Sequence, residues 1–152
     1  MQVETLQDVL HWTTEFHQYL SDCLLHCADK NESDRATMLL DYLAEHESRL
    51  ASVVEQFEKN GNSNALHTWC YEFIEKHPIV RSQHCDAPFA ELDTEQIMTV
   101  IVDQQQQVIE LYRDLFARAD IPSARELLEN LKSLEEHEAM LMSQGANRLN
   151  DL

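Results

Sequence analysis

Apolar residues recur every three or four positions along most of the chain, which is the spacing of one face of an α-helix. The first stripe contains Leu6, Leu10, Phe16, Leu20 and Leu24 and predicts a helix over about residues 3–29. Three further stripes predict helices over about residues 34–59, 95–119 and 122–145. The pattern therefore predicts an all-α protein built from four long helices.

Capping residues set the expected helix ends. Asp93 followed by Gln96 is typical of an N-terminal capping box, and Pro122 suits the first turn of the last helix. Gly61 and Gly145 each follow an apolar stripe, and glycine often ends a helix because it tolerates the left-handed conformation. We expect the second helix to end before Gly61 and the fourth to end at Gly145.

The segment over residues 60–93 does not continue the stripes. Pro78 and Pro88 interrupt its second half, and residues 65–76 favour one short helix. The order of elements is thus a helix pair, a long crossover and a second helix pair, which is the connectivity of ferritin-like bundles. We expect one ferritin-like four-helix domain over residues 1–152.

Polar residues interrupt or flank every stripe near the middle of its helix. Antiparallel packing would bring these positions to a similar height, which predicts a buried layer of imidazole, carboxylate and amide groups. Helices two and four also share the pattern Leu-x-x-His-Glu-x-x-Leu, over residues 43–50 and 134–141. The interrupting residues are His46, Glu47, Gln104, His137 and Glu138, and Thr13 and His17 flank the stripe of the first helix.

The second half of the chain resembles the corresponding half of a rubrerythrin-type ferritin-like domain. The resemblance is carried by residues 105–122, which include Tyr112 and the turn Asp120-Ile121-Pro122, and by residues 131–138. In that family a glutamate lies seven residues before such a tyrosine, and helix four carries Glu-x-x-His. The resemblance implies a bundle in which these residues hold two iron or manganese ions.

The chain departs from that family at most of the implied ligand positions. Gln105 stands seven residues before Tyr112, and Glu138 stands where helix four would carry histidine, three residues after Glu135. The matching positions in helices two and one are Ala44 with Glu47, and Trp12. These replacements favour a structural or interaction module without a complete di-iron site, and they favour a non-enzyme.

The alternative is a redox or storage protein with a non-standard ligand set. Iron, manganese and zinc are the metals considered, because histidine and glutamate ligate all three. A shifted register would also admit Glu15 or His17 from the first helix. The candidate metal ligands are His46, Glu47, Gln105, Glu135, His137 and Glu138.

Charge narrows the expected partners. The chain has 28 Asp and Glu against 11 Lys and Arg, a net charge of −17, so we expect no nucleic-acid binding, which needs clustered cations. No apolar run is long enough to span a membrane, and no secretory signal begins the chain, so we expect a cytoplasmic protein. We expect a homo-oligomer, most simply a dimer, and a further protein partner of unknown identity.

Cysteine and histidine chemistry is the last candidate. We expect all four cysteines to be thiols, with Cys23 and Cys27 packed in the core. The crossover also gathers residues that could ligate zinc, although their spacing matches no known zinc motif. These are His67, Cys70, His77, His84 and Cys85.

Overall fold

The computed structural model describes residues 5–70 and 88–150, and four long helices dominate them. They are α1 (Leu6–Ala28), α2 (Asp34–Asn60), α6 (Thr94–Arg118) and α7 (Pro122–Asn150). In the described parts of the stretch between α2 and α6 lie two short helices, α3 (Ser63–Leu66) and α5 (Pro88–Glu91). The prediction of an all-α four-helix bundle with a long crossover is confirmed.

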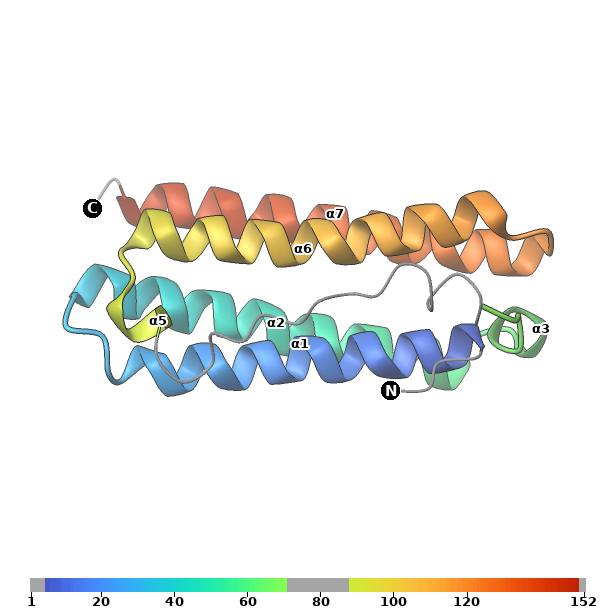
Figure 1. Cartoon of the computed structure of the whole chain (residues 1–152), viewed down its shortest axis with the longest axis horizontal. Helices are drawn as coiled ribbons and strands as arrows, with labels where there is room; N and C mark the ends of the chain where they lie inside the picture. The colour runs from blue at the N-terminus through green and yellow to red at the C-terminus, as the bar shows by residue number, and fades with distance from the viewer. Residues whose placement is uncertain (1–4, 71–87, 151–152) are drawn as a thin grey trace.

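The four helices lie side by side along the long axis of the molecule (Figure 1). α1 and α7 run in one direction, and α2 and α6 run in the other. Because α2 and α6 are parallel, the chain must return along the length of the bundle between them. The long crossover is therefore a requirement of the topology.

Helix starts follow the capping residues in the sequence. The Asp93 side chain accepts from the Gln96 backbone N–H, and the Gln96 side chain in turn accepts from the Asp93 N–H, so the predicted capping box is confirmed. Thr5 and Asp8 form an equivalent box at the start of α1. Ser33 caps α2 through its side chain.

Gly145 does not end the last helix, so the predicted boundary of 122–145 is wrong at its C-terminal side. α7 continues through this position to Asn150. A Cβ atom at Gly145 would lie 2.1 Å from Cζ and Oη of Tyr42, whose ring occupies that space. The Tyr42 hydroxyl donates to the Leu141 carbonyl at 2.8 Å. The glycine permits close contact between α2 and α7.

Gly61 follows the end of α2 as predicted, but for another reason. Its backbone has φ −70° and ψ 162°, which is not the left-handed conformation. A Cβ there would lie 2.6 Å from the Phe57 carbonyl oxygen. A close approach of backbone to backbone therefore explains this glycine.

Among the described residues, the predicted helix over 65–76 is wrong beyond Leu66. Helix α3 ends at Leu66, and residues 67–70 are not helical. Instead the Leu6 N–H donates to the Thr68 carbonyl at 2.8 Å, and Thr5 pairs with Trp69 in an isolated β-bridge. These contacts attach the start of the crossover to the start of α1. Residues 71–76 of that prediction lie outside the described residues.

One of the described cysteines differs from expectation. Cys23 is disulfide-bonded, so the prediction of four thiols is wrong for it. Cys27 and Cys70 are buried thiols, and burial raises the pKa of Cys70 to about 11. Three members of the proposed crossover zinc cluster, His77, His84 and Cys85, lie outside the described residues.

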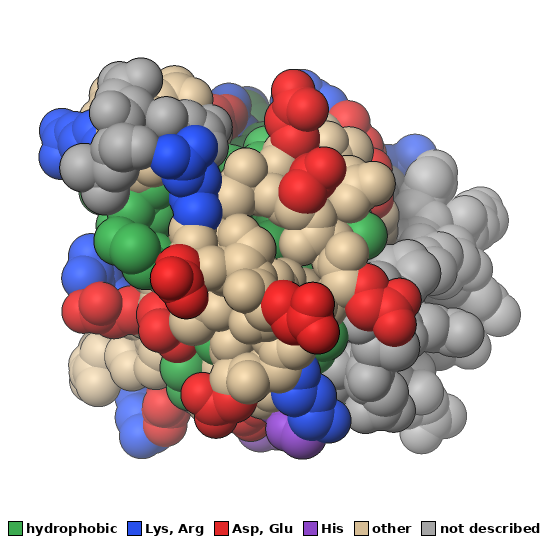
Figure 2. Space-filling view, turned by 90° about the vertical axis from the view of Figure 1, so that its left-hand side faces the viewer, with side chains coloured by type: hydrophobic (Ala, Val, Ile, Leu, Met, Phe, Trp, Pro, Cys, Tyr) green, Lys and Arg blue, Asp and Glu red, His purple; other side chains and the backbone are tan. Residues whose placement is uncertain are grey.

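The core joins apolar side chains of all four long helices. Most charged side chains lie outside it, and Asp and Glu occupy several separate places on the end of the bundle that holds the α1–α2 turn (Figure 2). Among the described residues no helix is long and apolar enough to cross a membrane. The largest fully buried side chains include Leu6, Leu10, Phe16, Leu24, Leu39, Leu40, Leu43, Leu50, Phe89, Ile97, Ile101 and Tyr112.

Candidate functional site

His17 lies at the centre of a polar layer inside the apolar core. Its Nδ1 is 2.6 Å from Oε2 of Glu47 on α2, and its Nε2 is 2.7 Å from Oε1 of Glu135 on α7. The three side chains are completely buried. One imidazole thus joins carboxylates from two other helices.

Gln105 brings the fourth helix into the layer. Its Nε2 donates to Oε1 of Glu47 at 2.6 Å, so both oxygens of that carboxylate are engaged. The carbonyl Oε1 of Gln105 and Oε2 of Glu135 are buried with no hydrogen-bond partner among the described residues. Oε1 of Gln104 is a third such atom, so the layer retains unused acceptors.

A second histidine–glutamate pair also joins α2 to α7. Nδ1 of His46 donates to Oε2 of Glu138 at 2.9 Å, and both side chains are about nine-tenths buried. The Tyr42 ring lies against the His46 ring with centroids 4.5 Å apart. Together with the His17 contacts, this pair places four ionisable groups of α2 and α7 in the bundle interior.

Neutral hydrogen bonds accompany the charged groups. The hydroxyl of Tyr112 on α6 donates to Oγ1 of Thr13 on α1 at 2.8 Å, and Thr13 donates to the Leu10 carbonyl at 3.1 Å. Ser21 donates to the Ala44 carbonyl at 2.8 Å. These contacts connect α1 to α6 and α2 by buried hydrogen bonds.

The hydrogen bonding determines the protonation of His17. Ionised carboxylates only accept hydrogen bonds, so an imidazole that contacts one through each nitrogen must donate from both and carry a positive charge. Burial alone lowers the pKa of His17, but the charges of Glu135 and Glu47 and their hydrogen bonds outweigh it and raise the pKa to about 10. His17 is an imidazolium at neutral pH.

Glu135 experiences opposing influences. Burial raises its pKa above the usual value of a glutamate, and the nearby charges of Glu47 and Glu138 act in the same direction. The charge of His17 and its hydrogen bond lower the pKa. His17 is thus the group that favours the ionised form of Glu135 in this interior.

The predicted site residues separate into two groups. His46, Glu47, Gln105, Glu135 and Glu138 are buried, as the polar-layer hypothesis requires. His137 lies exposed on α7, beside exposed Glu136, so it does not belong to the layer.

The central residue, His17, belongs to the polar layer that the sequence predicts, but as a metal ligand it is only an alternative to the six candidates. Its signal is spacing, because Thr13, His17 and Leu20 fall on one face of α1 at intervals of four and three. That spacing predicts burial but does not identify the partners. Gln104 and Thr13, also predicted from interrupted stripes, are buried.

The arrangement limits what the layer can do. His17, Glu47 and Glu135 are inaccessible to solvent, so a substrate has no route to them in this conformation. Among residues 5–70 and 88–150, no group of three His, Cys, Asp or Glu side chains is arranged to hold a metal ion. The contacts present hold a proton between carboxylates of different helices.

Comparison of the chain with protein-family models, curated proteins and solved structures found no match.

Proposed function

We propose that this protein is a ferritin-like helical module with a structural or interaction role, in which a protonated histidine takes the place of a metal centre. The observation that carries the proposal is the position of His17, within 2.7 Å of both Glu47 and Glu135. A metal ion in such a bundle supplies positive charge between carboxylates of facing helices. Here the imidazolium supplies that charge.

The polar residues at the implied ligand positions support the ferritin-like assignment. Glu47, Gln105 and Glu135 come from three helices and form one hydrogen-bonded group around His17 of the fourth. Gln105 contributes an N–H donor where the resemblance implies a carboxylate. Because the two carboxylates of the layer only accept hydrogen bonds, the N–H donor of Gln105 suits this layer better than a third carboxylate would.

Metal analysis tests the proposal. The protein is prepared in medium containing iron, manganese and zinc, desalted, and analysed for bound metal. We expect well under one equivalent of each metal, and no change in the thermal midpoint after chelator treatment.

Matched variants locate any metal that is found. Stoichiometric metal that is lost in Glu138→Ala but retained in Glu136→Ala would overturn the proposal, because Glu138 is buried in the layer and Glu136 is exposed on the same helix. The proposal also includes self-association. We expect a dimer in sedimentation equilibrium, and a protein that stayed monomeric at all concentrations would refute the expected dimer.

Metal binding is the second candidate, and the unused acceptors favour it. Oε2 of Glu135 and Oε1 of Gln105 have no partner among the described residues, and both are oxygen ligands suited to iron or manganese. Glu47, His46 and Glu138 would complete the donor set, whereas exposed His137 would not take part. His17 would have to release a proton for this site to form.

The proton that His17 must release provides a separate test of metal binding. Equilibrium dialysis with Mn²⁺ or Zn²⁺ should show affinity that rises steeply with pH, because metal and proton compete for the same carboxylates. Glu135→Gln should weaken the binding, and Glu136→Gln should leave it unchanged. Affinity that is equally low at all pH values and in both variants would exclude the metal site.

A further inference from the structure

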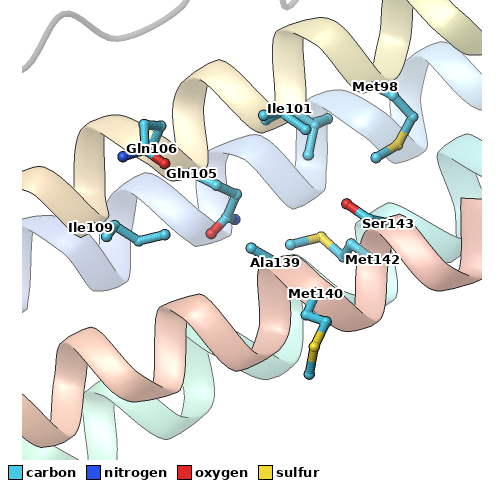
Figure 3. A pocket seen from close by; sticks show the side chains of 10 residues that line it. Met98, Ile101, Gln105, Gln106, Ile109, Ala139, Met140, Met142 and Ser143 are labelled. Atoms are coloured by element: carbon cyan, nitrogen blue, oxygen red, sulfur yellow. The ribbon is translucent and has the colours of Figure 1, made fainter.

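A groove between α6 and α7 lies beside the polar layer and has no role in the proposed function. Its volume is about 190 Å³, and every residue that lines it is uncharged. Met98 and Ile101 of α6 face Met142 and Ser143 of α7 across it, while Met140 points away from α6 (Figure 3). In a chain of net charge −17, this neutral surface disfavours ionic ligands.

Gln105 provides a polar group in the wall of the groove. The side chain is only 2% exposed, and its amide end projects from α6 toward α7 (Figure 3). The bond from Nε2 to the carboxylate of Glu47 fixes which end of the amide is nitrogen, because a carboxylate accepts and does not donate. The carbonyl oxygen is left buried with no partner among the described residues.

An unused buried carbonyl favours a ligand that can donate to it, and because this oxygen is closed to solvent, the groove must open slightly for the ligand to reach it. Leaving such an acceptor without a donor is costly, and a hydroxyl or amino group placed against it would remove that cost. The rest of the groove offers apolar contact and methionine sulfur. Thioether sulfur makes favourable contacts with aromatic rings, which favours an aromatic body over an aliphatic one.

The volume of the groove suits a single ring. Drug-sized ligands occupy pockets of roughly 300 Å³ or more, whereas an apolar cavity of about 150 Å³ accepts benzene. We propose that the α6–α7 groove binds a neutral, single-ring aromatic molecule whose hydroxyl or amino group donates to Oε1 of Gln105. Phenol is the simplest probe of this class.

Methionine methyl groups report the binding directly. The full-length protein is labelled with ¹³C at the methionine methyls and titrated with phenol. We expect saturable shifts of the Met98 and Met142 signals and no shift of Met38, which lies on α2 outside the groove. Equal shifts at Met38, or no saturation at any of them, would overturn the proposal.

Toluene tests the hydrogen bond, because it has the ring of phenol without the donor. We expect phenol to bind about three- to tenfold more tightly than toluene, the effect of one neutral hydrogen bond. In Gln105→Met, which replaces the amide with a thioether of similar length, that preference should disappear while toluene still binds. Equal affinity for both ligands in the unmodified protein would contradict the role of Gln105.

A variant that fills the groove provides the complementary test. Ala139 lines the groove on α7, so Ala139→Phe should abolish the phenol-dependent shifts. Ala117→Phe is the matched control, because Ala117 is exposed on α6 and outside the groove. The proposal would be overturned if the phenol-dependent shifts persisted in Ala139→Phe. It would also be overturned if the Met98 and Met142 signals shifted with protein concentration alone, because that result would assign the groove to a second copy of the chain.

Discussion

The stability of the fold should decrease at alkaline pH because His17 is buried as an imidazolium. Its pKa is about 10 in the folded protein and about 6.5 when the chain is unfolded. A group whose pKa is raised by folding stabilises the folded state fully below its unfolded pKa. That stabilisation is lost as the pH rises from about 6.5 through about 10.

The size of the effect follows from the two pKa values. The difference between about 10 and 6.5 corresponds to roughly 5 kcal/mol, at about 1.36 kcal/mol per pKa unit. Between about pH 7.5 and pH 9.5 the folded protein binds nearly one proton more than the unfolded chain, so the free energy of unfolding should fall by about 2–3 kcal/mol. With a typical urea dependence of about 2 kcal/mol per molar, the midpoint should shift down by roughly 1 M.

Urea titrations followed by circular dichroism at the two pH values measure this shift. His17→Gln serves as the comparison, because it retains every other titrating group. We expect the variant to be less stable near pH 7.5 and to show a much smaller fall in its midpoint. An equal fall in both proteins would refute the assignment of the imidazolium to His17.

Three further predictions concern the packing and capping of the bundle. Gly145→Ala should destabilise the fold by about 1–3 kcal/mol in urea titrations, because its Cβ meets the Tyr42 ring at 2.1 Å. In a Tyr42→Ala background the same substitution should instead stabilise the fold by about 0.5–1 kcal/mol, because alanine favours the helix more than glycine does. If Gly145→Ala destabilised the fold in both backgrounds, the contact with Tyr42 would be contradicted. Tyr112→Phe should cost about 1 kcal/mol by calorimetry, since it removes the buried bond to Thr13, and an unchanged thermal midpoint would argue against that bond. Asp93→Ala should cost about 1 kcal/mol by removing the α6 capping box, a loss that hydrogen exchange should localise to the first turn, and unaltered exchange there would count against the box.

The main features of the fold follow from local sequence rules. The apolar stripes determine where the four long helices lie, and Asp93 with Gln96 identifies the start of α6 because a capping box involves residues only three positions apart. Polar residues on an apolar stripe also predict burial, and Glu47 and Glu138 are indeed buried. These inferences need only the helical period.

Partners across the bundle could not be predicted in this way. His17 contacts Glu47 and Glu135, which are 30 and 118 positions away in the chain. Such pairings depend on the rotation of each helix about its axis, which the apolar period defines only approximately. The exposure of His137 has the same origin, because adjacent residues on a helix point about 100° apart and Glu138 faces the layer.

Gly145 shows how one residue type can indicate two different structures. Glycine after an apolar stripe often ends a helix, yet here it lies inside α7 because the Tyr42 ring needs the space of a side chain. The distinction depends on a residue of another helix that lies about a hundred positions away, as the bond from Tyr42 to Leu141 shows. The sequence around Gly145 does not indicate this contact with Tyr42.

The buried layer has a physical consequence beyond the proton itself. Ion pairs in an apolar interior stabilise a fold less than hydrophobic packing of the same volume, but removal of one partner leaves an uncompensated charge. Since His17 of α1 contacts carboxylates of α2 and α7, an altered helix register would separate these charges. We expect the layer to specify how the helix pairs align.

The protonation state of His17 is the most direct test of this account. A ¹⁵N spectrum of the histidine side chains, with His17 assigned by comparison with His17→Gln, can be recorded between about pH 7 and pH 10.5, a range that spans its raised pKa. We predict that both nitrogens of His17 remain protonated near pH 8 and that the ring titrates near pH 10. A neutral His17 ring near pH 8, with one nitrogen unprotonated, would contradict the central claim that an imidazolium joins Glu47 to Glu135.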